Sequence, residues 1–176
     1  MRILFISDIH GISNNLKYIK KIDEDNDFDK IVVLGDLYYN DKYETDNNAV
    51  RDFLDEKSKK IICLSGNCDT AKDILQSNFP IIDFGLINVD GIDIYLNHGD
   101  MYSYNKSSKL NKKGVLIYGH EHTPYIKKKD DMTFVCVGSI SLPRDDFGAS
   151  YGIYENKKIT IYNLEGLVIA ESYIGD

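Results

Sequence analysis

The sequence predicts an α/β fold in which two β-sheets pack face to face with helices outside. In the first half, apolar runs at residues 2–7, 31–35 and 61–65 are separated by segments with helical spacing, the alternation of buried parallel strands with helices. In the second half, strand-like segments follow one another with few helical stretches between them. A chain of 176 residues needs only one core, so a single domain over residues 1–176 is expected.

The first half is predicted to run strand, helix, strand, helix, strand. Apolar residues at helical spacing mark two helices, at Leu16, Ile19 and Ile22 and at Val50, Phe53 and Leu54. Ser13 is the expected N-cap of the first helix, and a short third helix is expected to start near Thr70. In the second half, Asp90-Gly91 and residues 155–157 have the composition of hairpin turns.

The composition excludes several classes of protein. A net charge of −7 argues against stable binding to nucleic acid or to an anionic membrane, because both need a basic surface. The longest apolar run is far shorter than the roughly 18 residues of a membrane span, and "RILFIS" begins the chain directly, so a cytoplasmic protein without a targeting segment is expected. Of three cysteines, Cys63 and Cys136 lie in apolar runs and are expected in the core.

Every histidine lies at the end of a predicted strand. The four are His10, His98, His120 and His122, and the ends of the first three strands carry Asp8, Asp36 and Asn67. Strand ends of an α/β sheet converge on one rim, so these seven side chains are expected to meet there. Imidazole, carboxylate and amide groups without thiolate suit manganese, iron, zinc, cobalt or nickel.

Each motif taken alone also has a structural interpretation. Asp8 could cap the first helix, His10 could be an ordinary loop residue, and Gly66 to Asp69 could simply form the turn that leaves a strand. The ordered set D-x-H, GD, GN, H-G and G-H-x-H is what indicates a metal site.

This ordered set resembles the calcineurin-like metallophosphoesterase superfamily, specifically its small bacterial and archaeal phosphodiesterases of the YfcE type. The segments "LFISDIHG", "IVVLGDLYYN", "SGNCD", "FPIIDFG", "NHGD", "VLIYGHEHTP", "VGSISLPR" and "SYGIY" carry the resemblance. It implies a four-layer αββα sandwich of the metallo-dependent phosphatase type, with two packed mixed β-sheets flanked by helices. It also implies two divalent ions per chain, expected to be manganese, with iron, zinc, nickel or cobalt as alternatives.

The resemblance implies a ligand set and an activity. One ion would be held by Asp8, His10, Asp36 and His122, and the other by Asp36, Asn67, His98 and His120, with Asp36 as the bridge. Small phosphodiesters would be hydrolysed by attack of a hydroxide activated by both metals, with Asp36, Asn67 and His98 as catalytic residues. Phosphomonoesters or phosphoproteins are alternative substrates, and a non-catalytic protein-binding scaffold is an alternative role. All seven ligand positions are retained, which favours the enzyme.

Three residues are expected near the substrate. Cys68 stands where many superfamily members have histidine, as it does in the YfcE-type branch, and is expected to be neither nucleophile nor ligand. Tyr38 and Tyr39 begin the polar loop "YYNDKYETDNN", where they could stack on a base or merely cover apolar surface.

Two further features have consequences that the sequence leaves open. Glu121 replaces the usual threonine between the two histidines, and Cys136-Val137 replaces a common Asn-Pro. Self-association into a dimer or tetramer is also expected, from the resemblance and from the apolar segment "VCVGSISL", which could form an exposed edge or patch.

Overall fold

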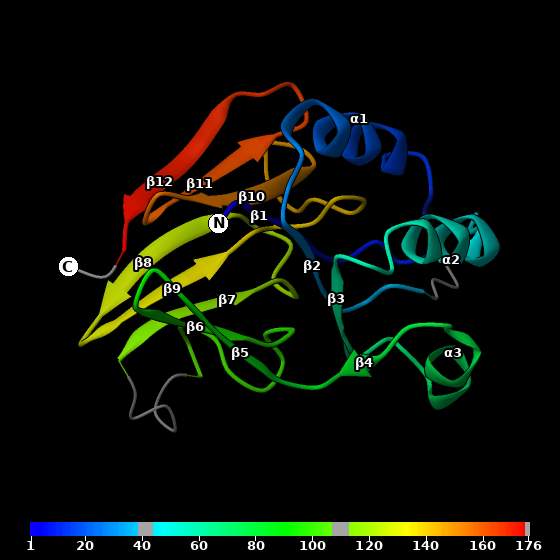
Figure 1. Cartoon of the computed structure of the whole chain (residues 1–176), viewed down its shortest axis with the longest axis horizontal. Helices are drawn as coiled ribbons and strands as arrows, with labels where there is room; N and C mark the ends of the chain where they lie inside the picture. The colour runs from blue at the N-terminus through cyan, green and yellow to red at the C-terminus, as the bar shows by residue number, and fades with distance from the viewer. Residues whose placement is uncertain (39–43, 107–112, 175–176) are drawn as a thin grey trace.

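The computed structural model of the chain consists of two β-sheets packed face to face, with helices at one side (Figure 1). It describes residues 1–38, 44–106 and 113–174. The strands are β1 (Ile3–Ile6), β2 (Lys30–Leu34), β3 (Ile61–Leu64), β4 (Ile81–Ile82), β5 (Gly85–Val89), β6 (Ile92–Leu96), β7 (Gly114–Tyr118), β8 (Tyr125–Lys129), β9 (Met132–Cys136), β10 (Ser150–Glu155), β11 (Lys158–Asn163) and β12 (Val168–Tyr173). The helices are α1 (Leu16–Asn26), α2 (Asn47–Glu56) and α3 (Ala71–Gln76).

Both sheets are mixed, as predicted. The seven-stranded sheet has the order β12-β11-β10-β1-β2-β3-β4, in which β1 to β4 are parallel and β10 to β12 are antiparallel. The five-stranded sheet has the order β5-β6-β7-β9-β8, with a parallel centre and two antiparallel edges. The parallel strands therefore present their carboxyl ends at one rim of the molecule, where the candidate ligands follow.

The layers follow from alternation of side chains along β1. Ile3 and Phe5 face the five-stranded sheet, while Leu4 and Ile6 face the helices. Each of these side chains is fully buried, and each such burial stabilises the fold by about 1.5–3 kcal/mol. A shift of register by one residue would exchange the two faces, so the pattern fixes the position of the strand.

The helices begin close to the predicted positions. The N-cap of α1 is Asn15, which corrects the expectation of Ser13. The Asn15 side chain makes no cap bond and donates instead to the Ile140 carbonyl at 2.7 Å, which ties the start of α1 to a loop beside the candidate site. Helix α3 starts after Thr70, as predicted, and Thr70 and Asp73 form a capping box. None of the helices in the described residues is long and apolar enough to cross a membrane.

The outer face of the five-stranded sheet is covered differently from the other sheet. Tyr102 and Tyr104, which follow β6, pack against a cluster that includes Tyr118 and Phe134. Within residues 1–38, 44–106 and 113–174, the layer that covers this face is the tyrosine segment and not a helix.

The segment "VCVGSISL" does not form an exposed edge. Strand β9 lies between β7 and β8, and Cys136, Val137 and Ile140 have no exposed surface, so this motivation for self-association is wrong. Exposed apolar side chains occur at several places on the surface, and two of them lie on and before the edge strand β5, where Phe84 is 40% and Leu86 is 55% exposed.

Candidate metal centre

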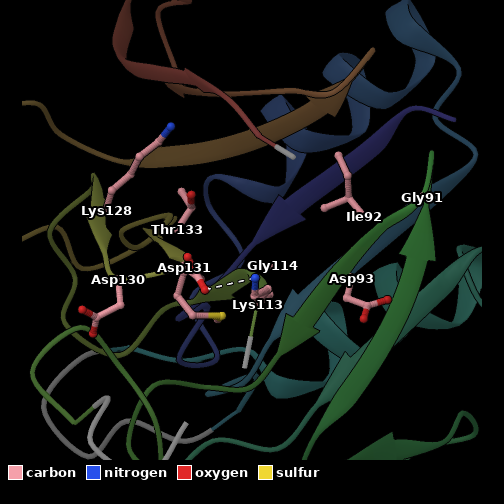
Figure 2. A pocket seen from close by; sticks show the side chains of 10 residues that line it. Gly91, Ile92, Asp93, Lys113, Gly114, Lys128, Asp130, Asp131 and Thr133 are labelled. Atoms are coloured by element: carbon pink, nitrogen blue, oxygen red, sulfur yellow. Dashed lines mark ion pairs between the residues drawn. The ribbon is translucent and has the colours of Figure 1, made fainter. Parts of the chain in front are cut away.

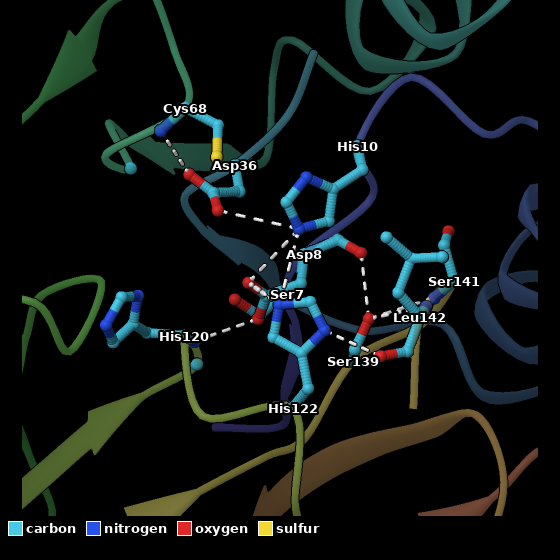
Figure 3. Close-up of polar contacts among 12 residues, drawn as sticks. Ser7, Asp8, His10, Asp36, Cys68, His120, His122, Ser139, Ser141 and Leu142 are labelled. Atoms are coloured by element: carbon cyan, nitrogen blue, oxygen red, sulfur yellow. Dashed lines mark hydrogen bonds and ion pairs between the residues drawn. The ribbon is translucent and has the colours of Figure 1, made fainter. Parts of the chain in front are cut away.

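The predicted ligands lie in the loops that follow β1, β2, β3, β6 and β7, and these loops meet at the rim. Figure 3 shows five of the ligands there: Asp8, His10, Asp36, His120 and His122. The loop after β1 is held against the loop after β2, because His10 N donates to the Asp36 carbonyl at 2.8 Å. The loops after β6 and β7 are joined in the same way, since Gly119 N donates to the His98 carbonyl at 2.9 Å. Backbone contacts thus fix the rim before any side chain is considered.

Five of the seven candidate ligands have left-handed backbone. The φ angles are 56° at Asp8, 53° at His10, 51° at Asp36, 63° at His120 and 58° at His122. Residues other than glycine seldom adopt this conformation, which costs of order 1–3 kcal/mol each and gathers at functional sites. The concentration of this strain on the candidate ligands indicates that the fold maintains their geometry against local preference.

The first group of ligands surrounds one oxygen of Asp8. Asp8 Oδ1 lies 3.1 Å from His122 Nε2 and 3.7 Å from His10 Nε2, and the two Nε2 atoms are 3.3 Å apart. Asp8 Oδ2 accepts from His120 N at 2.9 Å, which leaves Oδ1 buried and without a hydrogen-bond partner. His122 Nδ1 lies 2.6 Å from the Leu142 carbonyl and donates to it in the neutral ring, so Nε2 turns a lone pair toward Asp8.

The second group is built in the same way around Asp36 and His98. His98 Nδ1 lies 2.7 Å from the Leu34 carbonyl, while His98 Nε2 lies 3.3 Å from Asp36 Oδ2 and 3.2 Å from Asn67 Oδ1. The other oxygen, Asp36 Oδ1, accepts from Cys68 N at 2.8 Å. The rings of His98 and His120 are 5.0 Å apart, so His120 borders this group.

The donor set fits divalent cations. In each group, atoms that accept hydrogen bonds face one another, and only a cation or a proton between them makes that arrangement favourable. Asp36 Oδ2 is 3.5 Å from His10 Nε2 as well as close to His98, so its carboxylate stands between the two groups. Asp8 with His10 and His122, and Asp8 with Asp36 and His98, each place their ligand atoms within 4.8 Å of one another.

The pKa values of the site show how strongly the groups interact. Burial raises the pKa of Asp36, but the hydrogen bond and charge of His98 outweigh it and hold this pKa well below its usual range. Burial opposes protonation of His98, yet Asp36 and Asp8 raise its pKa to about 9. The pKa of His120 is lowered by burial and by the charge of His98. A cation held by His98 would take the place of its proton, because imidazole binds metals in the neutral form.

The three residues expected near the substrate have different positions. The Cys68 thiol has its sulfur within 4.8 Å of ligand atoms of His10 and Asp36, so it borders the centre. Burial and the charge of Asp36 raise the pKa of this thiol to about 12. Tyr38 is fully buried among the core residues beneath the helices, and its hydroxyl lies 3.1 Å from Ser77 Oγ. Tyr39 lies outside the described residues.

The structure also shows the contacts of two residues that depart from the family pattern, Glu121 and Cys136. Glu121 accepts a hydrogen bond from Tyr125 Oη at 2.9 Å, and Tyr125 Oη lies 2.7 Å from Tyr118 Oη. Glu121 is therefore tied to the tyrosines on the outer face of the sheet. Cys136 is buried, as predicted, and its thiol donates to the Gly119 carbonyl at 3.3 Å.

Two supporting residues were given no role by the sequence reasoning. Ser139 Oγ donates to the Asp8 carbonyl at 3.0 Å and accepts from Leu142 N at 2.8 Å, and so connects the loop of Asp8 to the loop after β9, whose Leu142 carbonyl holds His122. Its position in "VGSISLPR" within the resemblance was the available signal. Asp69 accepts from Leu37 N and Gly66 N. Because Asp69 lies in a turn motif, the sequence did not indicate that its carboxylate contacts a residue more than 30 positions earlier in the chain.

A pocket of about 420 Å³ lies away from this centre (Figure 2). Its lining includes Gly91, Lys113, Gly114 and Asp131, so it is at the start of β7, whereas His120 and His122 follow the end of that strand. Lys113 and Asp131 form an ion pair at 3.3 Å with both side chains exposed. The pocket contains none of the candidate ligands.

Known proteins share this sequence pattern. A model of the calcineurin-like phosphoesterase superfamily domain matches residues 1–158. The phosphodiesterase YfcE of Escherichia coli K12 is 28% identical over 172 residues, which cover 93% of this chain and 92% of that protein. A probable metallophosphoesterase of Methanocaldococcus jannaschii is 30% identical over 149 residues, covering 82% of this chain and 70% of that protein.

Solved structures share the fold. The structure of the E. coli phosphoesterase YfcE matches with a TM-score of 0.92 and 27% identity, over 99% of this chain and 100% of that chain. Vps29 of Entamoeba histolytica, complexed with zinc, matches with a TM-score of 0.66 and 18% identity, over 98% of each chain, which shows the fold alone. The match of the family model over residues 1–158 decides the assignment: this chain belongs to the calcineurin-like phosphoesterase superfamily and is a phosphoric ester hydrolase.

Proposed function

We propose that this chain hydrolyses small phosphodiesters at a centre for two divalent ions. The observation that carries the proposal is the convergence of lone pairs at the rim. His122 Nε2 faces Asp8 Oδ1, and His98 Nε2 faces Asp36 Oδ2 and Asn67 Oδ1. The first ion would be held by Asp8, His10, Asp36 and His122, and the second by Asp36, Asn67, His98 and His120. Manganese is the proposed metal, and nitrogen and oxygen ligands also suit iron, zinc, cobalt and nickel.

The protein's own groups supply orientation and charge. Two divalent ions held here would neutralise the phosphoryl oxygens and lower the pKa of a water molecule, so that attack on phosphorus proceeds near neutral pH. Asp36 would bridge the two positions, because its Oδ2 approaches both His10 and His98 while Oδ1 is fixed by Cys68 N. Leu34 and Leu142 accept hydrogen bonds from the ring nitrogens that face away, which holds His98 and His122 in place.

The side chain next to the ligands limits the choice of leaving group. Cys68 borders the centre at the position where many superfamily members have histidine, and a thiol is a weak substitute for an imidazolium that donates a proton. Such a thiol is a poor general acid for a departing alkoxide. The proposed substrates are therefore diesters with leaving groups that need no proton. Phosphomonoesters and phosphoproteins remain the second candidate class, because the same ligands would hold them.

A third role, as a protein-binding scaffold, has fold-level support alone. Vps29 shares the fold at 18% identity. The seven candidate ligands and their strained backbone argue for the enzyme, since a scaffold has no need of converging lone pairs at its rim.

Metal titration and a substrate panel test the proposal together. We expect two Mn²⁺ per chain by calorimetry and a higher kcat/KM for bis(p-nitrophenyl) phosphate than for p-nitrophenyl phosphate. Asp36→Asn should weaken both ion positions and lower kcat/KM at least about 100-fold, because it removes the charge shared by both. Asp131→Asn makes the same change of charge in the remote pocket and should leave both quantities unchanged. One ion per chain, or full activity in Asp36→Asn, would contradict the proposal.

A further inference from the structure

The carboxylate of Asp69 joins two loops at the rim. Its Oδ1 accepts from Leu37 N at 2.9 Å and from Tyr38 N at 3.1 Å, both in the loop after β2. Its Oδ2 accepts from Gly66 N at 2.8 Å, in the loop after β3. Both oxygens of this one side chain therefore have backbone donors, and the donors come from two different loops.

Each of these loops carries a candidate ligand next to the donor. Asp36 directly precedes Leu37, and Asn67 directly follows Gly66. Strands β2 and β3 run side by side in the sheet, but the paired positions end at Leu34 and Leu64, so the ladder stops before either ligand. Beyond that point, Asp69, which lies in the loop after β3, accepts two hydrogen bonds from the loop after β2, and the bond from Cys68 N to Asp36 Oδ1 is a third link between the loops. The bond from Gly66 N to Asp69 fixes the Asp69 side chain within its own loop.

The other group of ligands is supported by different contacts. Asp8 Oδ2 accepts from His120 N, and the Asp8 carbonyl accepts from Ser139 Oγ. His122 Nδ1 is held by the Leu142 carbonyl. None of these bonds involves Asp69, so a change at Asp69 acts directly on the loops of Asp36 and Asn67 and reaches the first group only through the loop of Asp36.

We infer that Asp69 is a positioning residue that sets the distance between Asp36 and Asn67 and thereby the geometry of the second ion position. This inference rests on the proposed function. Asp69 is assigned no ion, since it belongs to neither group of ligands and both of its oxygens accept hydrogen bonds from backbone N–H groups. It acts through the loops, and Asn67 belongs to the second ion position alone.

Asp69→Asn tests this role at constant size. The amide keeps one accepting oxygen, so at least one of the N–H donors on Leu37, Tyr38 or Gly66 must face an NH₂ group. We expect the affinity for the second Mn²⁺ ion to fall about 10–100-fold, which is the range for loss of a residue that orients a metal ligand. The affinity for the first ion should stay within about threefold of the wild-type value. At saturating Mn²⁺, kcat should recover toward that of the wild type. Asp69→Glu, which keeps the carboxylate, should restore part of the lost affinity.

Asp83→Asn is the matched control. Asp83 is exposed, accepts from Ser65 Oγ at 2.6 Å beside the same loop, and loses the same charge when changed. Both Mn²⁺ affinities of this variant should equal those of the wild type. Two results would overturn the inference: an equal loss of affinity for both ions in Asp69→Asn, or a loss of affinity in Asp83→Asn as large as that in Asp69→Asn. A general loss of stability or of charge would then explain the data.

Amide hydrogen exchange separates this inference from the proposed function. Exchange at the Leu37, Tyr38 and Gly66 amides can be followed by NMR without added metal, and should quicken in Asp69→Asn but not in Asp83→Asn. Unchanged exchange in Asp69→Asn would overturn the role of Asp69 even if the wild type binds two ions. A wild type that binds fewer than two Mn²⁺ while exchange responds as expected would instead overturn the proposed function.

Discussion

A methyl group added at Gly66 should disturb the candidate centre while every candidate ligand keeps its side chain. A Cβ built on Gly66 lies 2.8 Å from Asp36 Cγ, and it comes closer still to Asp36 Oδ1 and to the Asp36 backbone nitrogen. Side-chain rotation can move the carboxylate but not the nitrogen. Gly66→Ala must therefore push the loops after β2 and β3 apart.

The size of the effect follows from these contacts. Ordinary contacts of a Cβ begin near 3.4 Å, so the loops must separate by at least about 0.6 Å at Cγ and by more at the nitrogen. Overpacking of this kind typically costs about 1–3 kcal/mol of folding free energy. A displacement approaching 1 Å in a catalytic constellation can cost about 100-fold in rate, so we expect kcat/KM to fall about 10–100-fold.

The assay compares Gly66→Ala with Gly85→Ala. At Gly85 the nearest atom to a new Cβ is Leu96 Cδ1 at 3.4 Å, an ordinary contact, so this variant should match the wild type. Hydrolysis of bis(p-nitrophenyl) phosphate is measured at saturating Mn²⁺ and well below the Tm of each variant, which removes unfolding as a cause. Wild-type rate and Mn²⁺ stoichiometry in Gly66→Ala would refute the argument that this close approach holds Asp36 in place.

Three further outcomes are expected. Cys68→Ala should retain turnover of an activated diester, and loss of that turnover with both ions bound would give the thiol a direct role. Cys68→His should raise the rate of hydrolysis of esters with poor leaving groups by about 100-fold or more, because the imidazolium can act as a general acid. Burial raises the pKa of Tyr125 above its ordinary value near 10, so the folded state favours the neutral phenol. The contribution of Tyr125 to the free energy of unfolding is therefore complete below about pH 10 and is lost as the pH rises further. Urea unfolding should therefore show a smaller loss of stability above pH 10 in Tyr125→Phe than in the wild type, and equal losses would count against this. Sedimentation at micromolar concentration should show a dimer or tetramer, with the apolar edge around Leu86 covered, and a monomer alone would contradict that expectation.

Local sequence patterns determined which side chains lie at the rim of the sheet. Strand periodicity and the residues that follow each strand are local properties, and the parallel β1, β2 and β3 had to present Asp8, Asp36 and Asn67 at the same edge once they paired. The two mixed sheets and the start of α3 at Thr70 were predictable for the same reason.

Only the tertiary structure decided how distant segments meet. The sequence could not place β9 inside its sheet or bury Tyr38, because an apolar run has the same pattern at an edge and at a centre, and a tyrosine suits both core and surface. It also could not show that Asp8 Oδ1 lacks a partner or that Asp69 holds two loops. Those facts depend on which atoms of each carboxylate find backbone donors, and the donors come from loops whose separation is set by packing of the whole sheet.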